Sequence, residues 1–184
     1  MKIKIISGQL KGRYIKTPSS KTTRPTSSLL REAFFNILQS SIEDAKFLDL
    51  FAGSGAMGIE ALSKGALSST FVEKDKFAFS IIKDNISSLN LEGQADIFFM
   101  DVKKAVQFFK RKKKTFDIIF CDPPYKLAPK IVFGLLVEAS KLLSSGGRLF
   151  LEYGQKLEDC PLKIVSERNF SDTYLYEFSS LIDS

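Results

Sequence analysis

The sequence predicts an α/β fold. We expect a Rossmann-like, mostly parallel sheet of seven strands with an antiparallel last strand, preceded by a small N-terminal β-hairpin. Strand-like and helix-like segments alternate along most of the chain, which is typical of a parallel sheet with helices on both faces. A glycine-rich turn follows the first buried strand of this series. The last two strands are joined by a short connection, so the final strand is expected to run antiparallel.

The elements follow in order. Short β-like runs at residues 3–6 and 13–16 predict the hairpin, and residues 17–25 are expected to be loop. Thr26 or Ser27 is expected to cap a helix that runs to about Ser40, with apolar residues at helical spacing. Strands are then predicted at 47–51, 70–73, 95–100, 116–121 and 148–152, with helices ending at Lys64 and spanning 76–88, 102–112 and 129–143. A Ser-Gly-Gly turn is expected before residue 148, and strands at 162–167 and 173–179 form a final hairpin with no full crossover helix before it.

The charge of the chain is unevenly distributed. The chain has 184 residues, about one domain, and we divide it into an N-terminal extension, residues 1–25, and a body, residues 26–184. Residues 1–31 carry eight Lys or Arg and no Asp or Glu, whereas the remaining residues carry 19 basic and 21 acidic groups. Such a basic arm predicts a polyanionic partner, although a solvated tail is the alternative. The basic run Lys110–Lys114 closes a predicted helix and is expected to be solvated rather than to contact RNA.

Composition excludes several function classes. The absence of histidine excludes a His general base, a Ser-His-Asp triad and a His-ligated zinc site. Cys121 and Cys160 lie far apart with no CxxC, which excludes a disulfide framework and a four-cysteine metal site, and no metal is expected. No apolar run is long enough for a membrane span, and the N-terminal run is too short for a signal peptide. We therefore expect a cytoplasmic protein without a membrane contact.

The glycine-rich turn predicts a cofactor site. Gly53, Gly55 and Gly58 form a GxGxxG pattern between a strand and a helix, and Glu73 follows 20 residues after Gly53 at the end of the next strand. A carboxylate at that place can accept hydrogen bonds from both hydroxyls of a ribose. An adenosine-containing cofactor is therefore expected, with a tight structural turn and a surface Glu73 as the alternative.

The position of Asp49 favours one adenosine-containing cofactor over another. Asp49 lies four residues before Gly53, where it would repel the pyrophosphate of NAD but attract the ammonium and sulfonium of S-adenosylmethionine. The sequence therefore favours S-adenosylmethionine over NAD, with a purely bracing role as the alternative for Asp49. Asp101 closes the strand 95–100 and can accept from the N6 amine of adenine, cap the next helix, or do both.

The tetrapeptide Asp122-Pro-Pro-Tyr125 is the candidate catalytic site. It follows a buried strand at its carboxyl end, where open α/β sheets hold their ligands. Two prolines make the backbone rigid and remove two N–H donors, so the Pro123 carbonyl and the Asp122 carboxylate can both accept from one amino group. Tyr125 offers a ring face for stacking on a base, and Pro124 keeps the loop rigid. These groups suit an exocyclic amine of a nucleobase.

These motifs resemble those of a known family. The chain is similar to amino-methyltransferases with an [Asp/Asn]-Pro-Pro-[Tyr/Phe] motif, and within them to the RsmD type, the bacterial 16S rRNA guanine-N2 methyltransferases. The segments that carry the resemblance are Lys11-Gly-Arg13, Thr23-Arg-Pro-Thr26, Arg31-Glu-Ala-Phe-Phe-Asn36, Asp49-Leu-Phe-Ala-Gly-Ser-Gly-Ala-Met-Gly58, Ile59-Glu-Ala-Leu-Ser-Lys-Gly-Ala66, Val72-Glu-Lys-Asp75 and Asp122-Pro-Pro-Tyr125. Phe is also common at the position of Tyr125, and the tail after the fifth strand is short.

The resemblance implies an activity and its residues. The expected reaction is methyl transfer from S-adenosylmethionine to the N2 amine of one guanine in 16S rRNA on the assembled small subunit, by a monomeric enzyme. The alternative is another nucleobase amino-methyltransferase, such as a DNA adenine-N6 enzyme. A non-catalytic RNA-binding protein is disfavoured because both motifs are intact. The expected catalytic residues are Asp122, Pro123, Pro124 and Tyr125; the cofactor residues are Asp49, Phe51, Ala52, Gly53, Ser54, Gly55, Glu73, Lys74 and Asp101; and the RNA-binding residues are Lys11, Arg13, Arg24 and Arg31.

Overall fold

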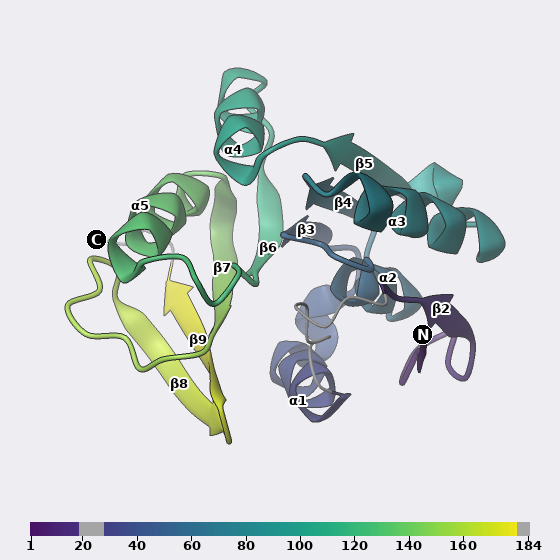
Figure 1. Cartoon of the computed structure of the whole chain (residues 1–184), viewed down its shortest axis with the longest axis horizontal. Helices are drawn as coiled ribbons and strands as arrows, with labels where there is room; N and C mark the ends of the chain where they lie inside the picture. Colours follow the sequence, from purple (N-terminus) through teal and green to yellow (C-terminus); the bar gives the residue numbers. More distant parts are fainter. Residues whose placement is uncertain (19–27, 180–184) are drawn as a thin grey trace.

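The fold is an α/β sandwich around one central sheet (Figure 1). A computed structural model describes residues 1–18 and 28–179. The central sheet has seven strands in the order β5-β4-β3-β6-β7-β9-β8, and a separate two-stranded sheet is formed by β1 and β2. The strands are β1 (Lys2–Lys4), β2 (Tyr14–Lys16), β3 (Lys46–Leu50), β4 (Ser68–Glu73), β5 (Ala95–Phe99), β6 (Phe116–Cys121), β7 (Leu143–Tyr153), β8 (Ile164–Phe170) and β9 (Thr173–Ser179). The helices are α1 (Ser28–Leu38), η1 (Gln39–Ile42), α2 (Ala56–Ser63), α3 (Lys76–Ser88), η2 (Glu92–Gln94), α4 (Val102–Arg111) and α5 (Pro129–Ser140).

The sheet has the predicted mixed topology. β3, β4, β5, β6 and β7 pair in parallel, whereas β9 pairs antiparallel with both β7 and β8. The order of the strands reverses between β3 and β6, so the carboxyl ends of these two strands flank the switch point where α/β sheets bind ligands. The predicted mostly parallel sheet with an antiparallel last strand is confirmed.

The two faces of the sheet carry different cores. On one face, Phe34 of α1 makes edge-to-face ring contacts with Phe47, Phe120 and Phe150 from three neighbouring strands. On the other face, alternate strand residues such as Leu48, Ile119 and Leu149 pack under α4 and α5. Figure 1 shows α4 and α5 on one side of the sheet, with α1, α2 and the hairpin on the other. Because strand residues alternate between faces, Asp49 and Glu152 lie on the Phe34 side.

The N-terminal hairpin packs on the body of the protein. Ile5 and Ile15 are each only 2% exposed and belong to the core beneath α1 and α2. The main-chain N–H groups of Ile6 and Ser7 donate to the buried carboxylate of Glu60 in α2, at 3.1 and 2.7 Å. The predicted hairpin is confirmed, and it is a docked element whose exposed side carries Lys2, Lys4, Lys11, Arg13 and Lys16.

One local prediction differs from the structure, and another cannot be compared with it. The segment that predicts a Ser-Gly-Gly turn lies inside β7, where the register with β6 shifts between Phe116 and Ile118. Extra residues can be absorbed as a bulge within a strand, so no separate turn is needed. Helix α1 is described from Ser28, so the predicted caps Thr26 and Ser27 lie outside the described residues. The short 3-10 turns η1 and η2 were not predicted.

Candidate active site

Main-chain hydrogen bonds fix the turn that follows β3 at the carboxyl edge of the sheet. Ala52 N donates to the Val72 carbonyl at 3.0 Å, and Gly55 N donates to the Ala52 carbonyl at 2.7 Å. Phe51, Gly53 and Gly55 all have positive φ angles, of 64°, 57° and 78°. Glycine tolerates this conformation at no steric cost, which explains its use at 53 and 55.

The third glycine of the pattern serves packing. A Cβ atom at Gly58 would lie 2.2 Å from a ring carbon of Phe71 and 2.4 Å from the Ser69 hydroxyl. Any side chain at position 58 would therefore push α2 away from β4. The same residue donates its N–H to Asp49 Oδ2 at 3.0 Å, which fixes the carboxylate under the first turn of α2.

Asp49 is a buried carboxylate on β3. Only 2% of it is exposed, and burial raises its pKa to about 7. The hydrogen bond from Gly58 opposes this rise in pKa, and the negative charge of Glu73 adds to it. The structure thus gives Asp49 the bracing contact considered as its alternative role. Such a buried carboxylate also gains from a cationic ligand, so one role does not exclude the other.

Glu73 reaches back to the same turn. Its Oε2 accepts from Gly53 N at 2.8 Å and its Oε1 accepts from Asp75 N at 2.7 Å. Each carboxylate oxygen has a second lone pair, so the group retains acceptor capacity toward a ligand. Glu73 is half-buried and Lys74 beside it is exposed, at the end of β4 next to the glycine-rich turn.

The remaining cofactor candidates lie along the same edge. Ala52 and Ser54 are buried in the turn, at 8% and 9% exposed. Asp101 follows β5 and is exposed, and its Oδ1 accepts from Lys103 N at 2.9 Å as the N-cap of α4. The capping role predicted for Asp101 is confirmed, and its contact with adenine stays a prediction.

The tetrapeptide Asp122-Pro-Pro-Tyr125 begins immediately after β6, beside the end of β3. Asp122 N lies 3.4 Å from the Leu50 carbonyl, so the main chain of the two strands stays paired up to the motif. Pro123 is buried, Pro124 is exposed, and Tyr125 is 46% exposed. The motif therefore combines a fixed main chain with an accessible aromatic ring. The structure brings it together with the turn at 49–55 across the switch point of the sheet.

Glu152 is a residue of this site that the sequence analysis did not single out. It lies near the end of β7, is 4% exposed, and follows the register pair Cys121–Leu151, which makes it the lateral neighbour of Asp122. Burial raises the pKa of Asp122 well above its usual range, and the charges of Glu152 and Asp49 add to that rise. A signal was present in the sequence, because Glu152 ends a strand at the same edge as Asp122.

Tyr125 is packed against Gly154, the residue that follows β7. A Cβ atom at Gly154 would lie 2.3 Å from Cδ1 of Tyr125, so the ring lies directly over this glycine. Burial raises the pKa of the Tyr125 hydroxyl, and the negative charge of Glu152 raises it further. A hydrogen bond with Thr173 lowers this pKa, but by less than burial raises it. The ring is thus fixed on one side and exposed on the other.

The RNA-binding candidates separate into three groups. Lys11 and Arg13 are exposed on the hairpin, and Arg13 Nη2 donates to the Ser88 carbonyl at 3.1 Å. Arg24 lies outside the described residues. The prediction for Arg31 is wrong: it is 3% exposed, donates to the Lys4 carbonyl at 2.9 Å, and has its Nε 3.7 Å from Glu60. A guanidinium buried between the hairpin and α2 cannot reach an RNA phosphate.

Asn85 was also missed by sequence reasoning. It is 1% exposed in α3, and its Nδ2 donates both to the Lys16 carbonyl and to the Ser54 carbonyl, at 2.9 and 3.0 Å. Its Oδ1 accepts from Lys16 N at 2.8 Å. No local pattern marks an asparagine on a helix as a link between a hairpin and a loop, because both partners are distant in sequence.

Residues 1–18 and 28–179 hold neither a metal cluster nor a membrane-spanning helix. No group of three or more His, Cys, Asp or Glu in these ranges is arranged to hold a metal ion. None of the helices found there is long and apolar enough to cross a membrane.

The chain resembles known proteins along most of its length. Residues 3–178 match the family described as Conserved hypothetical protein 95. The Bacillus subtilis protein named "Putative rRNA methyltransferase YlbH" is 34% identical over 156 residues, which cover 85% of each chain. The Escherichia coli K12 protein named "Ribosomal RNA small subunit methyltransferase D" is 39% identical over 147 residues, covering 80% of this chain and 69% of that protein.

Solved structures share the fold. A hypothetical protein from Thermus thermophilus superimposes with a TM-score of 0.84 at 31% identity, covering 96% of this chain and 98% of that one. The structure titled "Putative methyltransferase yhhF from Escherichia coli" has a TM-score of 0.79 at 30% identity, covering 98% of each chain. A putative methyltransferase complexed with SAH has a TM-score of 0.68 at 17% identity, which shows a common fold only; the match covers 82% of this chain and 48% of that one. On the match over residues 3–178 and these curated relatives, the chain belongs to the Conserved hypothetical protein 95 family, which is the RsmD family.

Proposed function

We propose that this protein is an rRNA methyltransferase that transfers a methyl group from S-adenosylmethionine to the exocyclic N2 amine of one guanine in 16S rRNA. Its proposed substrate is the assembled small ribosomal subunit. The observation that carries the proposal is the position of Asp122-Pro-Pro-Tyr125 beside the Asp49–Gly55 turn at one edge of the sheet. Relatives named ribosomal RNA small subunit methyltransferase D, at 38% and 39% identity, support the rRNA substrate class.

The residues along this edge fit S-adenosylmethionine. The buried carboxylate of Asp49, with its raised pKa, would be stabilised by the ammonium or sulfonium of that molecule. Glu73 would accept from the ribose hydroxyls, and Asp101 from the adenine amine. Phe51, Ala52, Ser54 and Lys74 would complete the surroundings of the cofactor. S-adenosylmethionine supplies the electrophilic methyl group of the reaction.

The tetrapeptide orients the amine. The lone pair of a guanine amine is delocalised into the ring, so the amine must be held with its nitrogen turned toward the methyl group. Asp122 and the Pro123 carbonyl would do this by accepting the two amine hydrogens. These hydrogen bonds strengthen as the nitrogen becomes positively charged, which is the condition for lowering a barrier. Tyr125 would stack on the base after it leaves the RNA loop, and Pro124 would keep the loop rigid.

The last step is loss of a proton. Methyl transfer would leave a positive charge on the amine nitrogen, so the product must release one proton. The raised pKa of Asp122 makes its carboxylate a better proton acceptor than an exposed aspartate. We propose that Asp122 takes this proton and that no covalent enzyme intermediate forms.

We propose that the enzyme acts as a monomer in the cytoplasm. Residues 1–25 would then serve as an RNA-contacting extension of the methyltransferase body, residues 26–184. Lys11, Arg13 and Arg24 are the proposed phosphate contacts of this extension, and Arg31 is not among them because it is buried.

Mass analysis of rRNA nucleosides tests the proposal. Cells that lack the gene should lose one N2-methylguanosine from 16S rRNA, and plasmid-borne wild-type protein should restore it. The Asp122→Ala variant, expressed at the same level, should not. Unchanged 16S rRNA in the deletion strain would refute the guanine-N2 assignment. Loss of a methylated adenine from DNA would instead support the alternative, a DNA adenine-N6 methyltransferase.

A further inference from the structure

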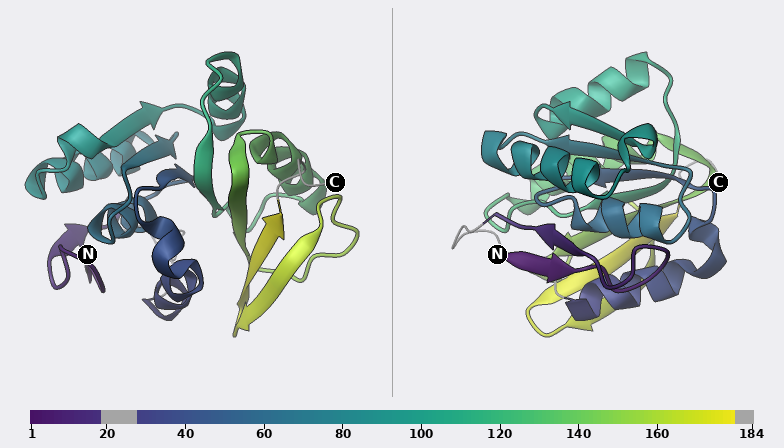
Figure 2. Two further views of the ribbon diagram at one scale, coloured as in Figure 1. Left: turned by 180° about the vertical axis from the view of Figure 1, so that it is seen from behind. Right: turned by 90° about the vertical axis from the view of Figure 1, so that its right-hand side faces the viewer.

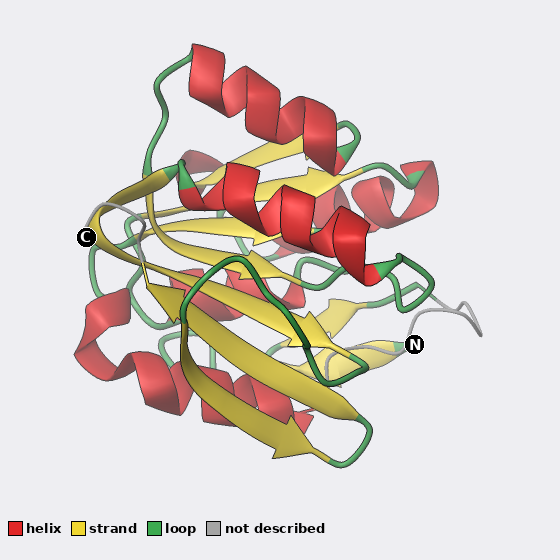
Figure 3. Ribbon diagram, turned by 90° about the vertical axis from the view of Figure 1, so that its left-hand side faces the viewer, coloured by secondary structure: helices red, strands yellow, loops and turns green. Residues whose placement is uncertain are grey.

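Two hollows flank helix α4. The first lies between α4 and α5, has a volume of about 290 Å³, and includes Lys103, Gln107, Lys130 and Ile131 in its lining. The second lies on the other side of α4, has a volume of about 560 Å³, and is lined in part by Lys103 and Gln107 as well. The two hollows therefore adjoin at Lys103 and Gln107, on the first turns of α4. Figure 3 shows the two helices side by side over the sheet.

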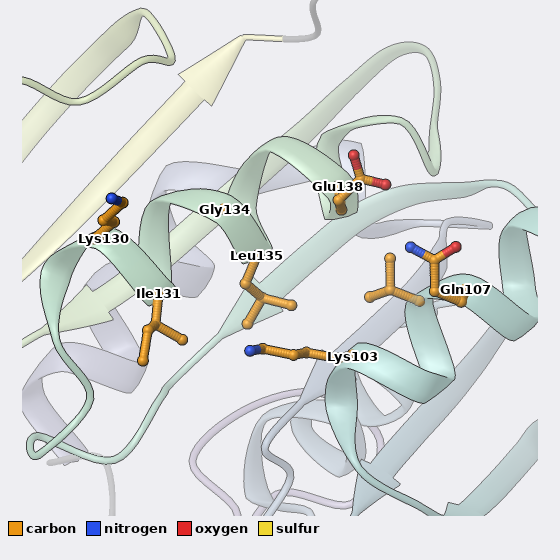
Figure 4. A pocket seen from close by; sticks show the side chains of 8 residues that line it. Lys103, Gln107, Lys130, Ile131, Gly134, Leu135 and Glu138 are labelled. Carbon is orange, nitrogen blue, oxygen red and sulfur yellow. The ribbon is translucent and has the colours of Figure 1, made fainter.

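The lining of the first hollow, which we call the α4–α5 groove, has positive rims and an apolar floor. Figure 4 shows the Lys103 side chain extending from α4 into the space below Leu135, and Lys130 at the start of α5. Val106, Ile131 and Leu135 supply the floor. Lys103 and Lys130 are exposed and form no ion pair within the part of the chain that the structure describes.

The one carboxylate in this lining is neutralised. Glu138 forms ion pairs with Lys110 and Lys141, both at 2.5 Å. Hydrogen bonds from these two lysines lower the pKa of Glu138 to about 2. Glu138 therefore remains ionised, and its charge is balanced by the two lysines. Lys103 and Lys130, which are unpaired among the described residues, then give the groove a net positive charge. Two residues of the basic run Lys110–Lys114 are in ion pairs: Lys110 with Glu138, and Lys114 with Asp96 at 3.0 Å.

The α4–α5 groove starts at the edge of the sheet that holds the candidate active site. Lys103 lies two residues after Asp101, and Lys130 lies five residues after Tyr125. The N-terminal hairpin packs into the core on one face of the sheet, and α4 and α5 pack into the core on the other face, as the left view of Figure 2 shows. A polyanion that reached the tetrapeptide could therefore contact the hairpin on one side and the groove on the other.

We propose that the α4–α5 groove binds the sugar–phosphate backbone of single-stranded RNA next to the target base, with Lys103 and Lys130 contacting its phosphates. This inference rests on the proposed function only for the identity of the polyanion. Lysines on the rims match the phosphate charge, and the apolar floor accommodates riboses and base faces. An acidic protein segment would meet the same two rim lysines, but it carries no riboses or base faces to cover the apolar floor.

Salt dependence of binding tests this inference. The double variant Lys103→Gln/Lys130→Gln is compared with wild type and with the control Lys46→Gln/Lys163→Gln, whose exposed lysines lie at the amino ends of β3 and β8. The probes are small subunits from the deletion strain and oligouridylate. For single strands each phosphate contact contributes about 0.7 to the slope of log K against log salt, so the groove variant should lose about 1.4. Wild type should then lose roughly sevenfold more affinity than the variant between about 50 and 200 mM salt.

The controls separate the possible failures. The Lys46/Lys163 variant should keep the wild-type slope, and all three proteins should bind S-adenosylmethionine equally, which shows that they are folded. A wild-type slope in the groove variant with oligouridylate, or an equal loss of slope in the control variant, would overturn the inference. If deletion of the gene leaves the rRNA unchanged, the proposed function fails, yet the slope with oligouridylate still decides whether the groove binds RNA.

Discussion

Asn85 Nδ2 donates to the main-chain carbonyl of Ser54 at 3.0 Å, inside the glycine-rich turn. The same amide group is hydrogen-bonded to both the N–H and the carbonyl of Lys16, the last residue of β2. One buried side chain therefore connects the N-terminal hairpin to the proposed cofactor turn.

Replacing Asn85 tests that connection. Asn85→Asp keeps the acceptor for Lys16 N but removes both donated hydrogen bonds and places a charge near the Ser54 carbonyl. We expect a loss of roughly 1–3 kcal/mol in unfolding free energy, the scale for unsatisfied buried groups, and weaker S-adenosylmethionine binding. Thermal unfolding and calorimetry measure the two effects. Lys83→Ala, an exposed site on the same helix, is the control and should change neither.

The raised pKa of Asp49 predicts pH-dependent cofactor binding. With a pKa of about 7 in the free protein, the side chain is mostly neutral at pH 6 and mostly ionised at pH 8. A cationic ligand prefers the ionised form, so affinity for S-adenosylmethionine should rise over this interval. Asp49→Asn should remove the pH dependence and weaken binding at pH 8 by about 10- to 100-fold, as for one hydrogen bond to a charged group. Calorimetry from pH 6 to 8 measures this, and a pH-independent wild type would contradict the assignment.

The same pKa has a consequence for stability. The folded-state value of about 7 exceeds the unfolded-state value of roughly 3.9, so the folded protein binds more protons between these pH values. The contribution of Asp49 to stability is therefore lost as pH rises from about 4 to 7. Without cofactor, Asp49→Asn should raise the melting temperature at pH 8 relative to wild type, and should change it little at pH 4. Glu43→Gln, at an exposed site, should raise it at neither pH.

Asp122 should be essential for turnover. Asp122→Ala removes one orienting acceptor, and we expect single-turnover methyl transfer to fall by at least ~10²-fold, the cost of one preorganised transition-state contact. Affinity for S-adenosylmethionine should change little, because the glycine-rich turn follows another strand. The assay uses small subunits from the deletion strain. Near-normal turnover in this variant would mean that the amine is held elsewhere.

Glu152 should set the pH range in which Asp122 works. Its charge adds to the rise in the pKa of Asp122, and only the ionised carboxylate of Asp122 can accept the amine hydrogens. Glu152→Gln removes that charge, so the acidic limb of the pH–rate profile should move to lower pH. The profile is measured at saturating S-adenosylmethionine, so that the pH dependence of cofactor binding through Asp49 does not enter it. Glu158→Gln, an exposed site in the loop after β7, is the control. An unshifted acidic limb would mean that Glu152 does not act on Asp122.

Much of this architecture was predictable because it depends on local patterns. The alternation of strands and helices, the GxGxxG turn and the position of Asp122 at a strand end are all local in the sequence. In α/β sheets the carboxyl ends of parallel strands lie at one edge, where ligands bind. The amino-acid order alone was therefore enough to expect Asp49, Glu73 and Asp122 at that edge.

The remaining features depend on contacts between distant residues. Arg31 belongs to a basic segment by composition, yet its guanidinium is buried against Glu60, 29 residues away in sequence. Asn85 contacts Lys16 and Ser54 across the fold. Charge counts and helical periodicity report neither contact, because they describe a residue's neighbours along the chain and not those in space.

The position of the Tyr125 ring gives a final prediction. Gly154→Ala would place a Cβ atom 2.3 Å from Cδ1 of Tyr125, so the ring must move away from β7. If Tyr125 stacks on the target base, this displacement should lower substrate affinity and turnover together and leave S-adenosylmethionine binding unchanged. Tyr125→Ala should have the same two effects, whereas Tyr125→Phe should be mild because the ring face is retained.

Gly93→Ala is the matched control, since nothing lies within 4 Å of a Cβ atom at that position. Single-turnover methylation at several subunit concentrations separates affinity from rate. Normal values in Gly154→Ala, with normal melting, would show that the ring position over β7 does not matter for the base.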